Sequence, residues 1–424
     1  MINEGFYRIL KHEMVPALGC TDPIGIAFCA AAARKHTRGE IRKIDAFFSG
    51  NLIKNVAAVI IPGSGGLCGA RIATALGAVC GDADKKLEVL KGITASQVKE
   101  AVELEKSGAL TVHTADSTSV LYMEIRMITE QDEVTVILQD GYTNITHIIV
   151  NGSDLFEDRE GCCSDESSLP YDELELDSIL DFASNAPMEL LEPVETGLGM
   201  NEKLACAGFE RDFGAGAGKA IRDMMADGSG ERNLAYSAMM WTAAGVDARM
   251  AGCELPAMSN TGSGNQGIVS TMPVLGAAKV TGASWETLVR AAAVSCLTTI
   301  YIKSSVGPLS TVCGCTIAGT GAACGMIYLR GGGKPEMISA FKNMFGNVAG
   351  IICDGAKASC ALKAATCINA ACMAADLALN GFGLESTNGI VGRGERDSID
   401  YFVRTSKEGL GKMDPVILDI IMNK

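Results

Sequence analysis

The amino-acid sequence predicts an α+β protein, in which a mainly α-helical domain carries a small inserted α/β domain. Three observations support this fold class. The chain has 424 residues, 48% of them hydrophobic, which is enough for two or three domains. Only 5% of the residues are aromatic and 49 are glycine, a balance that favours closely packed helices over a β-sandwich. Strand-like patterns are concentrated between residues 118 and 150, and helical patterns fill most of the rest.

The first part of the chain is predicted to combine helices with a group of strands. From Lys85 to Ser107, apolar residues recur at three- and four-residue spacing, as on one face of an amphipathic helix. Three runs that are rich in β-branched residues and free of proline follow. The predicted helices are 2–13, 23–36, 66–80 and 85–107, and the predicted strands are 43–48, 118–128, 133–139 and 145–150.

The later part of the chain is predicted to be almost wholly helical. Two segments without charge, 255–278 and 304–329, are long enough to span a bilayer, but they are full of Gly, Ser, Thr and Asn. Such polar density is unsuited to lipid, so we interpret both as interior segments and predict no membrane span. The predicted helices are 172–193, 197–227, 231–249, 284–302, 335–347 and 361–380.

The change of pattern along the chain predicts two domains. Residues 1–83 and 165–424 form a discontinuous helical domain, and residues 84–160 form the inserted α/β domain. Between Asp154 and Asp177 the sequence carries many acidic residues against Arg159 alone, so this segment is predicted to be a solvated linker or exposed loop.

Charge and the N-terminal sequence narrow the class of protein. The formal net charge is −14, and no basic stripe compensates for it, which argues against a nucleic-acid surface. The first residues, MINEGFYRILKHEM, contain no apolar run of signal-peptide length, so we expect a cytoplasmic protein with reduced thiols.

Sixteen cysteines are the most unusual feature of the composition. Many have apolar neighbours and read as small buried residues. Cys20, in VPALGCTDPIG, stands just ahead of a predicted helix N-terminus, where the dipole and unpaired amides favour thiolate. Two readings stay open from the residues alone: Cys20 is a nucleophile or base, or it is a packed cysteine at a helix entry.

Four further cysteines lie on two short segments, in STVCGCTIAGTGAACG and GIICDGAKASC. They are flanked by Gly, Ser and Asp, as if held on turns or helix ends, which suits zinc or iron–sulfur ligation. Their spacing matches neither a zinc ribbon nor a ferredoxin run, so spacing alone leaves a metal site open. These residues are Cys313, Cys315, Cys353 and Cys360.

Other kinds of catalytic site find little support. None of the four histidines lies in an HExxH motif, there is no GxSxG elbow, and no P-loop is present. Lys357 or Lys363 could be proposed for a pyridoxal enzyme, but nothing around them distinguishes them from ordinary lysines.

Five blocks of sequence resemble the iron–sulfur L-cysteine desulfidases, which are related to the α part of iron–sulfur L-serine dehydratases. The resemblance runs from residue 13 to residue 363. The blocks are EMVPALGCTDPIG, GNLIKNVAAVIIPGSGG, SNTGSGNQG, STVCGCTIAGTGAACGMIYLRGG and GIICDGAKASCALK.

The resemblance implies a catalytic helical domain with a [4Fe-4S] cluster held by three cysteines and one iron left open for substrate. By motif, Cys313, Cys353 and Cys360 match the cluster ligands, and Cys20 matches the cysteine that accepts the α-proton. The implied reaction is β-elimination of L-cysteine to pyruvate, ammonia and hydrogen sulfide. Cys315 and Cys324 would then be bystanders.

Polar segments near these blocks supply candidate contacts to a small amino-acid substrate. Lys54 is expected to pair with its carboxylate, and Asp22 to serve as a helix cap or as a partner of the thiol. The alternative is that such residues only cap helices and line turns. The proposed substrate-binding residues are Asn51, Lys54, Ser259, Asn260, Ser263, Asn265 and Gln266.

Two other functions remain open from the sequence. One is L-serine deamination by the same cluster chemistry, and the other is a cysteine-rich protein that binds a metal without catalysis. We also expect a homodimer, because large Ala- and Gly-rich helical enzymes often associate.

Overall fold

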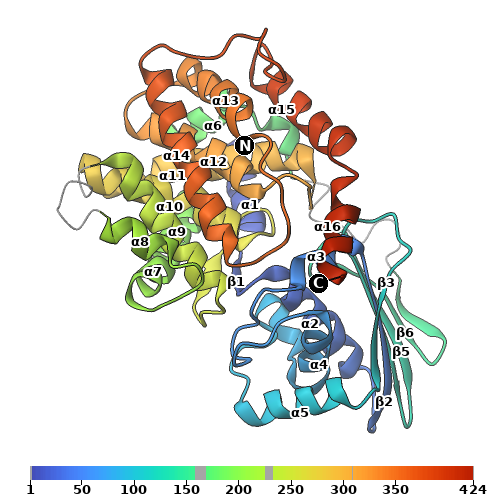
Figure 1. Cartoon of the computed structure of the whole chain (residues 1–424). Helices are drawn as coiled ribbons and strands as arrows, with labels where there is room; N and C mark the ends of the chain where they lie inside the picture. The colour runs from blue at the N-terminus through green and yellow to red at the C-terminus, as the bar shows by residue number, and fades with distance from the viewer. Residues whose placement is uncertain (1, 158–168, 225–232, 308, 424) are drawn as a thin grey trace.

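The structure is a computed structural model that describes residues 2–157, 169–224, 233–307 and 309–423. It is an α+β fold, as the sequence predicts, with a helical part and a smaller part built on one mixed sheet (Figure 1). Each part has its own hydrophobic core.

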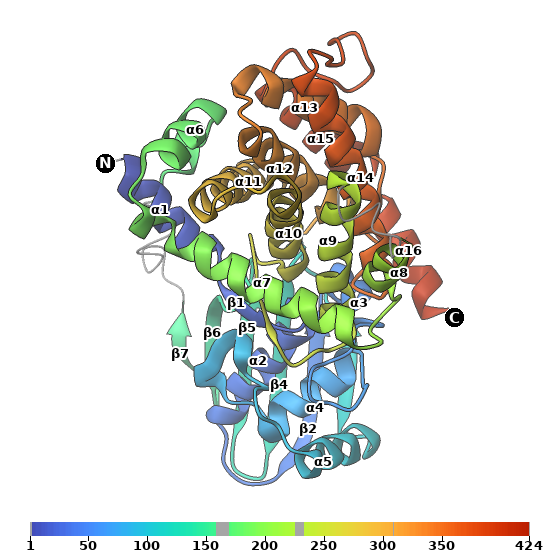
Figure 2. The same cartoon turned by 90° about the vertical axis from the view of Figure 1, so that its left-hand side faces the viewer.

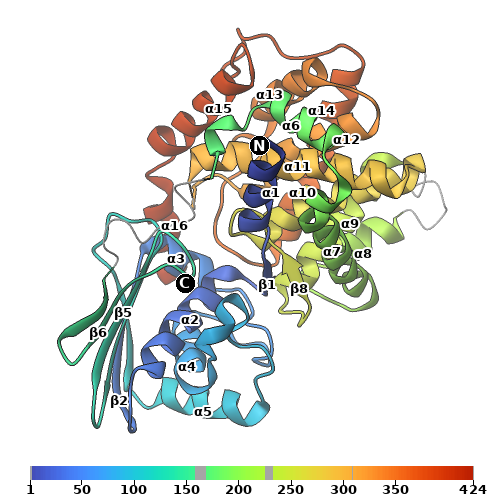
Figure 3. The same cartoon turned by 180° about the vertical axis from the view of Figure 1, so that it is seen from behind.

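The smaller part is a six-stranded sheet with helices on one face. The strand order is β3-β2-β4-β5-β6-β7, in which only the β2–β3 pair is parallel. Helices α2, α4 and α5 cover one face, and the other face lies on the outside of the molecule (Figures 1 and 3). The elements are α2 (Thr21–Lys35), β2 (Ile41–Phe48), α3 (Gly50–Val56), α4 (Ala70–Cys80), α5 (Ala95–Lys106), β3 (Leu110–Thr114), β4 (Tyr122–Thr129), β5 (Glu133–Gln139), β6 (Ile145–Val150) and β7 (Ser153–Glu157).

This part of the molecule begins well upstream of residue 84, where composition places its boundary. Strand β2 lies inside the sheet, between β3 and β4, and α2 and α4 supply much of the same core. The predicted division at residue 84 therefore cuts through one packed unit, because the early strand pairs with strands that follow it by more than sixty residues.

The larger part is a bundle of long helices. Figure 2 shows α9, α10, α11 and α12 side by side, with α7 crossing them. Its elements are α1 (Ile2–Glu13), α6 (Leu176–Asn185), α7 (Glu192–Glu210), α8 (Ala217–Asp223), α9 (Leu234–Met250), α10 (Gly264–Thr281), α11 (Trp285–Val306), α12 (Gly314–Leu329), α13 (Lys334–Val348), α14 (Ser359–Leu379), α15 (Glu395–Arg404) and α16 (Met413–Met422).

Small residues bring these helices close together. A Cβ atom on Gly321 of α12 would lie 2.5 Å from the Ser295 carbonyl oxygen of α11. One on Gly276 of α10 would lie 2.7 Å from the Ser237 carbonyl oxygen of α9. Contacts this close leave no room for a side chain, which explains why glycine stands at these positions.

Several element boundaries differ from those predicted. The charge-free segments 255–278 and 304–329 contain most of helix α10 and all of helix α12. Both helices are buried on nearly all sides and so show no amphipathic period. The predicted helix 172–193 is divided before Pro187, and the predicted helix 197–227 is divided between α7 and α8. Residues 158–168 of the acidic segment, residues 225–227 and residues 231–232 lie outside the described residues.

Among the described helices, α14 alone is long and apolar enough to span a bilayer. However, 56% of its apolar window is buried within the structure, which is the pattern of a core helix. The short antiparallel pair β1 (Pro16–Leu18) and β8 (Pro256–Met258) joins the N-terminal segment to the helical part.

Candidate active site

A cavity of about 120 Å³ lies where the two parts of the molecule meet. Drug-sized or nucleotide-sized ligands need several times this space, so the cavity suits a small molecule. Chemically active side chains from both parts line it: Cys20, Asp22, Asn51, Lys54, Asn55, Tyr142, Arg249, Ser263, Asn265, Gln266, Lys303, Cys313, Cys315, Cys353 and Cys360.

Cys20 is the N-cap residue of α2 and is buried. The tight turn before it depends on Gly19, which has a φ of +70° and leaves no space for a Cβ against Pro62. The Cys20 thiol donates a hydrogen bond to Asp22 Oδ2 at 3.3 Å. Burial, and then the Asp22 carboxylate, raise the pKa of Cys20 well above its ordinary value, while Arg249 lowers it. The thiolate expected from the helix dipole is therefore not the resting form, because desolvation outweighs the helix terminus.

Asp22 is the partner of the thiol, one of the two roles expected for it. Its other oxygen, Oδ1, accepts hydrogen bonds from Asn55 Nδ2 at 3.2 Å and from the Tyr142 hydroxyl at 3.0 Å. Tyr142, which the sequence did not indicate, reaches Asp22 from the turn between β5 and β6. The sheet thereby contributes directly to the site.

Cys313 and Cys353 lie on two segments that two backbone hydrogen bonds join, with Cys313 opposite Ile351 and Cys353 opposite Thr311. The Cys313 amide donates to the Ile351 carbonyl at 2.8 Å, and the Cys353 amide donates to the Thr311 carbonyl at 2.7 Å. An antiparallel bridge between Val312 and Ile352 completes the contact. The two cysteine-bearing segments, forty residues apart in the chain, thus meet in a fixed register.

Cys360 faces the same cavity from the first turn of α14. Burial, and then Cys313, raise the pKa of Cys360 to about 12. Cys315 lies next to Cys313, and a hydrogen bond from the Cys315 thiol lowers the pKa of Cys313 to about 7. The four thiols therefore act on one another electrostatically.

The donor set can be compared with the cluster that the resemblance implies. Among the described residues, no three His, Cys, Asp or Glu side chains are grouped tightly enough for a single metal ion. A cubane iron–sulfur cluster holds its thiolates farther apart than a single ion does. Three thiols on the wall of one cavity, two of them on bridged segments, fit such a cluster by the chemistry of their donors.

The polar residues expected to contact the substrate fall into two groups. Ser263, Asn265 and Gln266 line the cavity at the N-terminus of α10, where the Ser263 hydroxyl caps the Gln266 amide at 3.3 Å. Ser259 and Asn260 do not line it. Instead, the Ser259 hydroxyl donates to the Val15 carbonyl at 2.6 Å, and the Asn260 side chain donates to the Cys296 carbonyl at 3.2 Å. Both residues therefore fix the position of the loop that precedes α10.

Lys54 lines the cavity together with Asn51, but its charge is already matched. Its Nζ lies 2.6 Å from Asp414 Oδ1 of α16 and donates to the Cys353 carbonyl at 3.2 Å. Lys54, for which pairing with a substrate carboxylate is expected, thus already has a carboxylate partner within the protein.

Two buried cations in the cavity wall were not found from the sequence. Arg249 is in the last turn of α9, and Lys303 is in the last turn of α11. Burial lowers the pKa of Lys303 to about 8. The sequence could have indicated Arg249, because arginine is unusual in a stretch as rich in small apolar residues as AAGVDARMAG, which is typical of a buried helix.

Lys357 and Lys363, considered for a pyridoxal enzyme, do not line the cavity. Lys363 pairs with Asp354 and also donates to the Ile352 carbonyl at 3.1 Å, and Lys357 binds the Asp354 carbonyl. Both lysines fasten the 353–360 segment.

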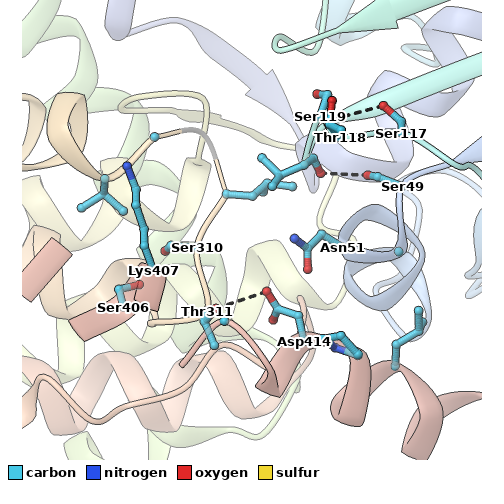
Figure 4. Close-up of a pocket in the computed structure, with 18 residues that line it drawn as sticks. Ser49, Asn51, Ser117, Thr118, Ser119, Ser310, Thr311, Ser406, Lys407 and Asp414 are labelled. Carbon is cyan, nitrogen blue, oxygen red and sulfur yellow. Dashed lines mark hydrogen bonds between the residues drawn. The ribbon is translucent and has the colours of Figure 1, made fainter. Parts of the chain in front are cut away.

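A larger hollow of about 630 Å³ adjoins the cavity and shares Asn51, Leu309 and Ser310 with it. In Figure 4, Asn51, Ser310 and Asp414 face this hollow from three different elements. The Thr311 hydroxyl donates to Asp414 Oδ2 at 3.2 Å at its base. Helix α16 thus borders the larger hollow and also anchors Lys54 of the smaller one.

The sequence is similar to those of several known proteins. The sequence model of the family described as serine dehydratase alpha chain matches residues 84–419. A UPF0597 protein of Bacteroides fragilis is 38% identical over 423 residues, which cover 98% of this chain and 97% of that protein. A UPF0597 protein of Clostridium perfringens is 36% identical over 424 residues, covering 100% and 99%. One of Latilactobacillus sakei is 39% identical over 425 residues, covering 99% and 98%.

Proposed function

This chain belongs to the serine dehydratase alpha chain family, a family of iron–sulfur lyases, and from that premise we propose that it eliminates hydrogen sulfide from L-cysteine. The products would be pyruvate and ammonia. The observation that carries the proposal is the meeting of Cys20 with Cys313, Cys353 and Cys360 around one small cavity.

Cys313, Cys353 and Cys360 would hold a [4Fe-4S] cluster. When bound, it supplies a Lewis-acidic iron with one position open to substrate. The protein orients its ligands through the backbone bonds between residues 311–313 and 351–353 and through the first turn of α14. Lys54 and Lys363 fasten the 352–354 backbone by donating to the Cys353 and Ile352 carbonyls.

Cys20 is the proposed base that removes the α-proton of the substrate. At rest it is a thiol held against Asp22, so it must first lose its own proton, for which the Asp22 carboxylate is the adjacent acceptor. Loss of the α-proton and of the β-sulfur as hydrosulfide leaves aminoacrylate. Aminoacrylate tautomerises and is hydrolysed by water to pyruvate and ammonia.

L-Serine is the second candidate substrate, and the family description favours it. Hydroxide is a poorer leaving group than hydrosulfide, but a Lewis acid assists both. We also propose a cytoplasmic location, because the cysteines in the described part of the chain are all free thiols. A homodimer remains part of the proposal.

Anaerobic reconstitution with iron and sulfide tests the function. We expect iron–sulfur absorbance together with pyruvate release from L-cysteine, and release from L-serine would identify the second candidate. Absorbance without pyruvate from either amino acid would contradict the lyase assignment.

Replacement of the base gives a sharper test. Cys20→Ala should keep the cluster absorbance and lower pyruvate release by about 10²- to 10⁴-fold, the usual contribution of a general base. Cys29→Ala is the matched control, because Cys29 is a buried cysteine on the same helix whose thiol faces the Val136 carbonyl instead of the cavity. Loss of the absorbance in Cys20→Ala would mean that Cys20 is a cluster ligand.

A further inference from the structure

Arg249 is a buried guanidinium in the cavity wall whose charge is not matched by a carboxylate in the described part of the chain. Its side chain is 3% exposed, and Nη1 donates to the neutral Asn265 Oδ1 at 2.9 Å. Its Nε is buried without a hydrogen-bond partner. The nearby Asp247 is turned away, because its oxygens accept from the amides of Ala215 and Gly218.

Such an arrangement is costly unless an anion completes it. A buried charge without a counter-ion loses hydration and gains little in return, so buried cations in proteins are normally paired. The protein nevertheless brings the N-terminus of α10 directly against this group. A Cβ on Gly264 would lie 2.3 Å from Arg249 Nε, so only glycine allows the approach. The helix terminus adds further positive potential at the same place.

Two buried acceptors in the same cavity receive no hydrogen bond from any described residue. They are Asn55 Oδ1 and Gln266 Oε1. The orientation of Asn55 is set by Asp22, because only the amide nitrogen of Asn55 can donate to that carboxylate. The orientation of Gln266 is set by Thr261, whose hydroxyl donates its proton to the Asn260 carbonyl and so accepts from Gln266 Nε2. Both amide oxygens are therefore available to a ligand that donates.

We propose that Arg249 binds the α-carboxylate of the substrate, and that Asn55 and Gln266 accept hydrogen bonds from its α-ammonium. This inference rests on the proposed function and names the groups that recognise an α-amino acid. It also replaces Lys54, whose charge Asp414 matches. Asn55 and Cys20 contact the same Asp22 carboxylate, so an ammonium at Asn55 holds the α-carbon on the side of the base.

The test is binding of L-alanine, which has no β-leaving group, to the cluster-loaded protein by isothermal titration calorimetry. L-Alaninamide lacks the carboxylate, and propionate lacks the ammonium. We expect the wild-type protein to bind L-alanine at least tenfold more tightly than either analogue. Absence of L-alanine binding, or equal binding of L-alaninamide, overturns the proposal.

Arg249→Gln should weaken L-alanine binding by about 10- to 100-fold. It should also abolish the preference over L-alaninamide, because the positive charge that favours a carboxylate over an amide is gone. Arg249→Lys should weaken L-alanine binding less, since lysine keeps the positive charge but cannot donate two parallel hydrogen bonds to a carboxylate. Arg290→Lys is the matched control, because Arg290 is also shielded but binds the Ala183 and Ala186 carbonyls far from the cavity.

A merely structural role for Arg249 would lower stability without removing the preference for the carboxylate. Melting temperature and cluster absorbance of each variant are measured alongside, and Arg249→Lys carries the test if Arg249→Gln does not fold. A preference that is as large in folded Arg249→Gln, or in folded Arg249→Lys, as in the wild-type protein overturns the inference. If binding behaves as expected but no pyruvate forms, only the proposed reaction fails.

Discussion

Cys20 depends on a single carboxylate for the hydrogen bond of its thiol and for part of the rise in its pKa. Asp22 accepts from the thiol, and its charge is the second cause, after burial, of the raised pKa of Cys20. A base with a raised pKa is protonated at neutral pH, so its active form becomes more abundant as the pH rises. We therefore expect kcat/KM for L-cysteine to rise through the alkaline range.

Asp22→Asn should move this rising limb to lower pH. Removal of the negative charge favours the thiolate, while the remaining amide oxygen can still accept from Asn55 and Tyr142. The pH profile of kcat/KM is the measurement.

Tyr142→Phe is the control for that profile. This variant removes one hydrogen bond to Asp22 and leaves the charge of Asp22 in place. The rise of kcat/KM should therefore occur at the same pH as in the wild-type protein. A limb that stays in place or moves to higher pH in Asp22→Asn would show that the carboxylate does not set the acidity of Cys20.

The sequence indicated some of the residues that line the cavity and missed others. The motif blocks indicated the cysteines, Asn51 and the 263–266 segment, all of which the structure brings to one cavity. Arg249 and Tyr142 lie outside those blocks, and they reach the cavity only through the contact of α9 with α10 and through the β5–β6 turn. Such contacts depend on tertiary packing, which no local pattern records.

At the scale of elements, the contact between helices α2 and α4 fixes the position of Cys20. Helix α2, which begins directly after this residue, packs against α4 so closely that a Cβ on Gly77 would lie 2.2 Å from the Ala27 carbonyl oxygen. Because the obstacle is backbone, a rotamer change cannot relieve it.

Gly77→Ala should destabilise the protein by about 1–3 kcal/mol, since α2 and α4 must move apart to admit the methyl group. Gly199→Ala is the control, because Gly199 also lies in a helix but a Cβ added there would meet nothing within 4 Å. It should instead stabilise by up to about 1 kcal/mol through helix propensity. Thermal unfolding distinguishes them, and a similar melting temperature for both variants would contradict the packing argument.

Element type was predictable wherever one face of an element meets solvent. The strands at 133–139 and 145–150 are observed at the predicted residues, because both are rich in β-branched residues and free of proline. The strand at 133–139 also alternates buried positions with partly exposed ones. Helices α10 and α12 are buried on nearly all sides, so no polar face marks them. Several of their glycines, among them Gly276 and Gly321, serve close contacts between helices.

At the scale of the whole molecule, one ion pair joins distant parts of the chain. Lys54 of α3 and Asp414 of α16 are separated by 360 residues, and their side chains are 3% and 16% exposed. Helix α16 has no fully buried residue of its own. Its position therefore depends strongly on this pair and on the contact with α3.

Asp414→Asn should release α16, because it leaves the Lys54 ammonium buried without its partner, a change that costs about 2–4 kcal/mol. Hydrogen exchange of residues 413–422 should accelerate, while exchange in α10, α11 and α12 stays unchanged. Asp419→Asn, at an exposed position on the same helix, is the control.

Replacing both partners tests the same idea in the opposite direction. The double variant Lys54→Met with Asp414→Leu should recover slow exchange in α16, because apolar pairs often substitute for buried ion pairs. Unchanged exchange in Asp414→Asn would show that α16 is held by other contacts.

The overall fold class was predictable from composition and period, but the extent of the sheet was not. The pairing of β2 with β3 and β4 joins residues 41–48 to residues 110–129, and such long-range register leaves no mark in either segment alone. The charge pattern likewise gave no sign that Lys54 would meet Asp414.

The wide sequence separation of the cavity residues also has a consequence for how the protein is made. Synthesis proceeds from the N-terminus at about 5–20 residues per second, so Cys20 and Lys54 leave the ribosome well before Cys353 and Asp414 exist. Until then Lys54 must remain hydrated, and the cavity has only one of its walls. Completion of the site, and any loading of a cofactor into it, must therefore follow translation of at least the first 414 residues.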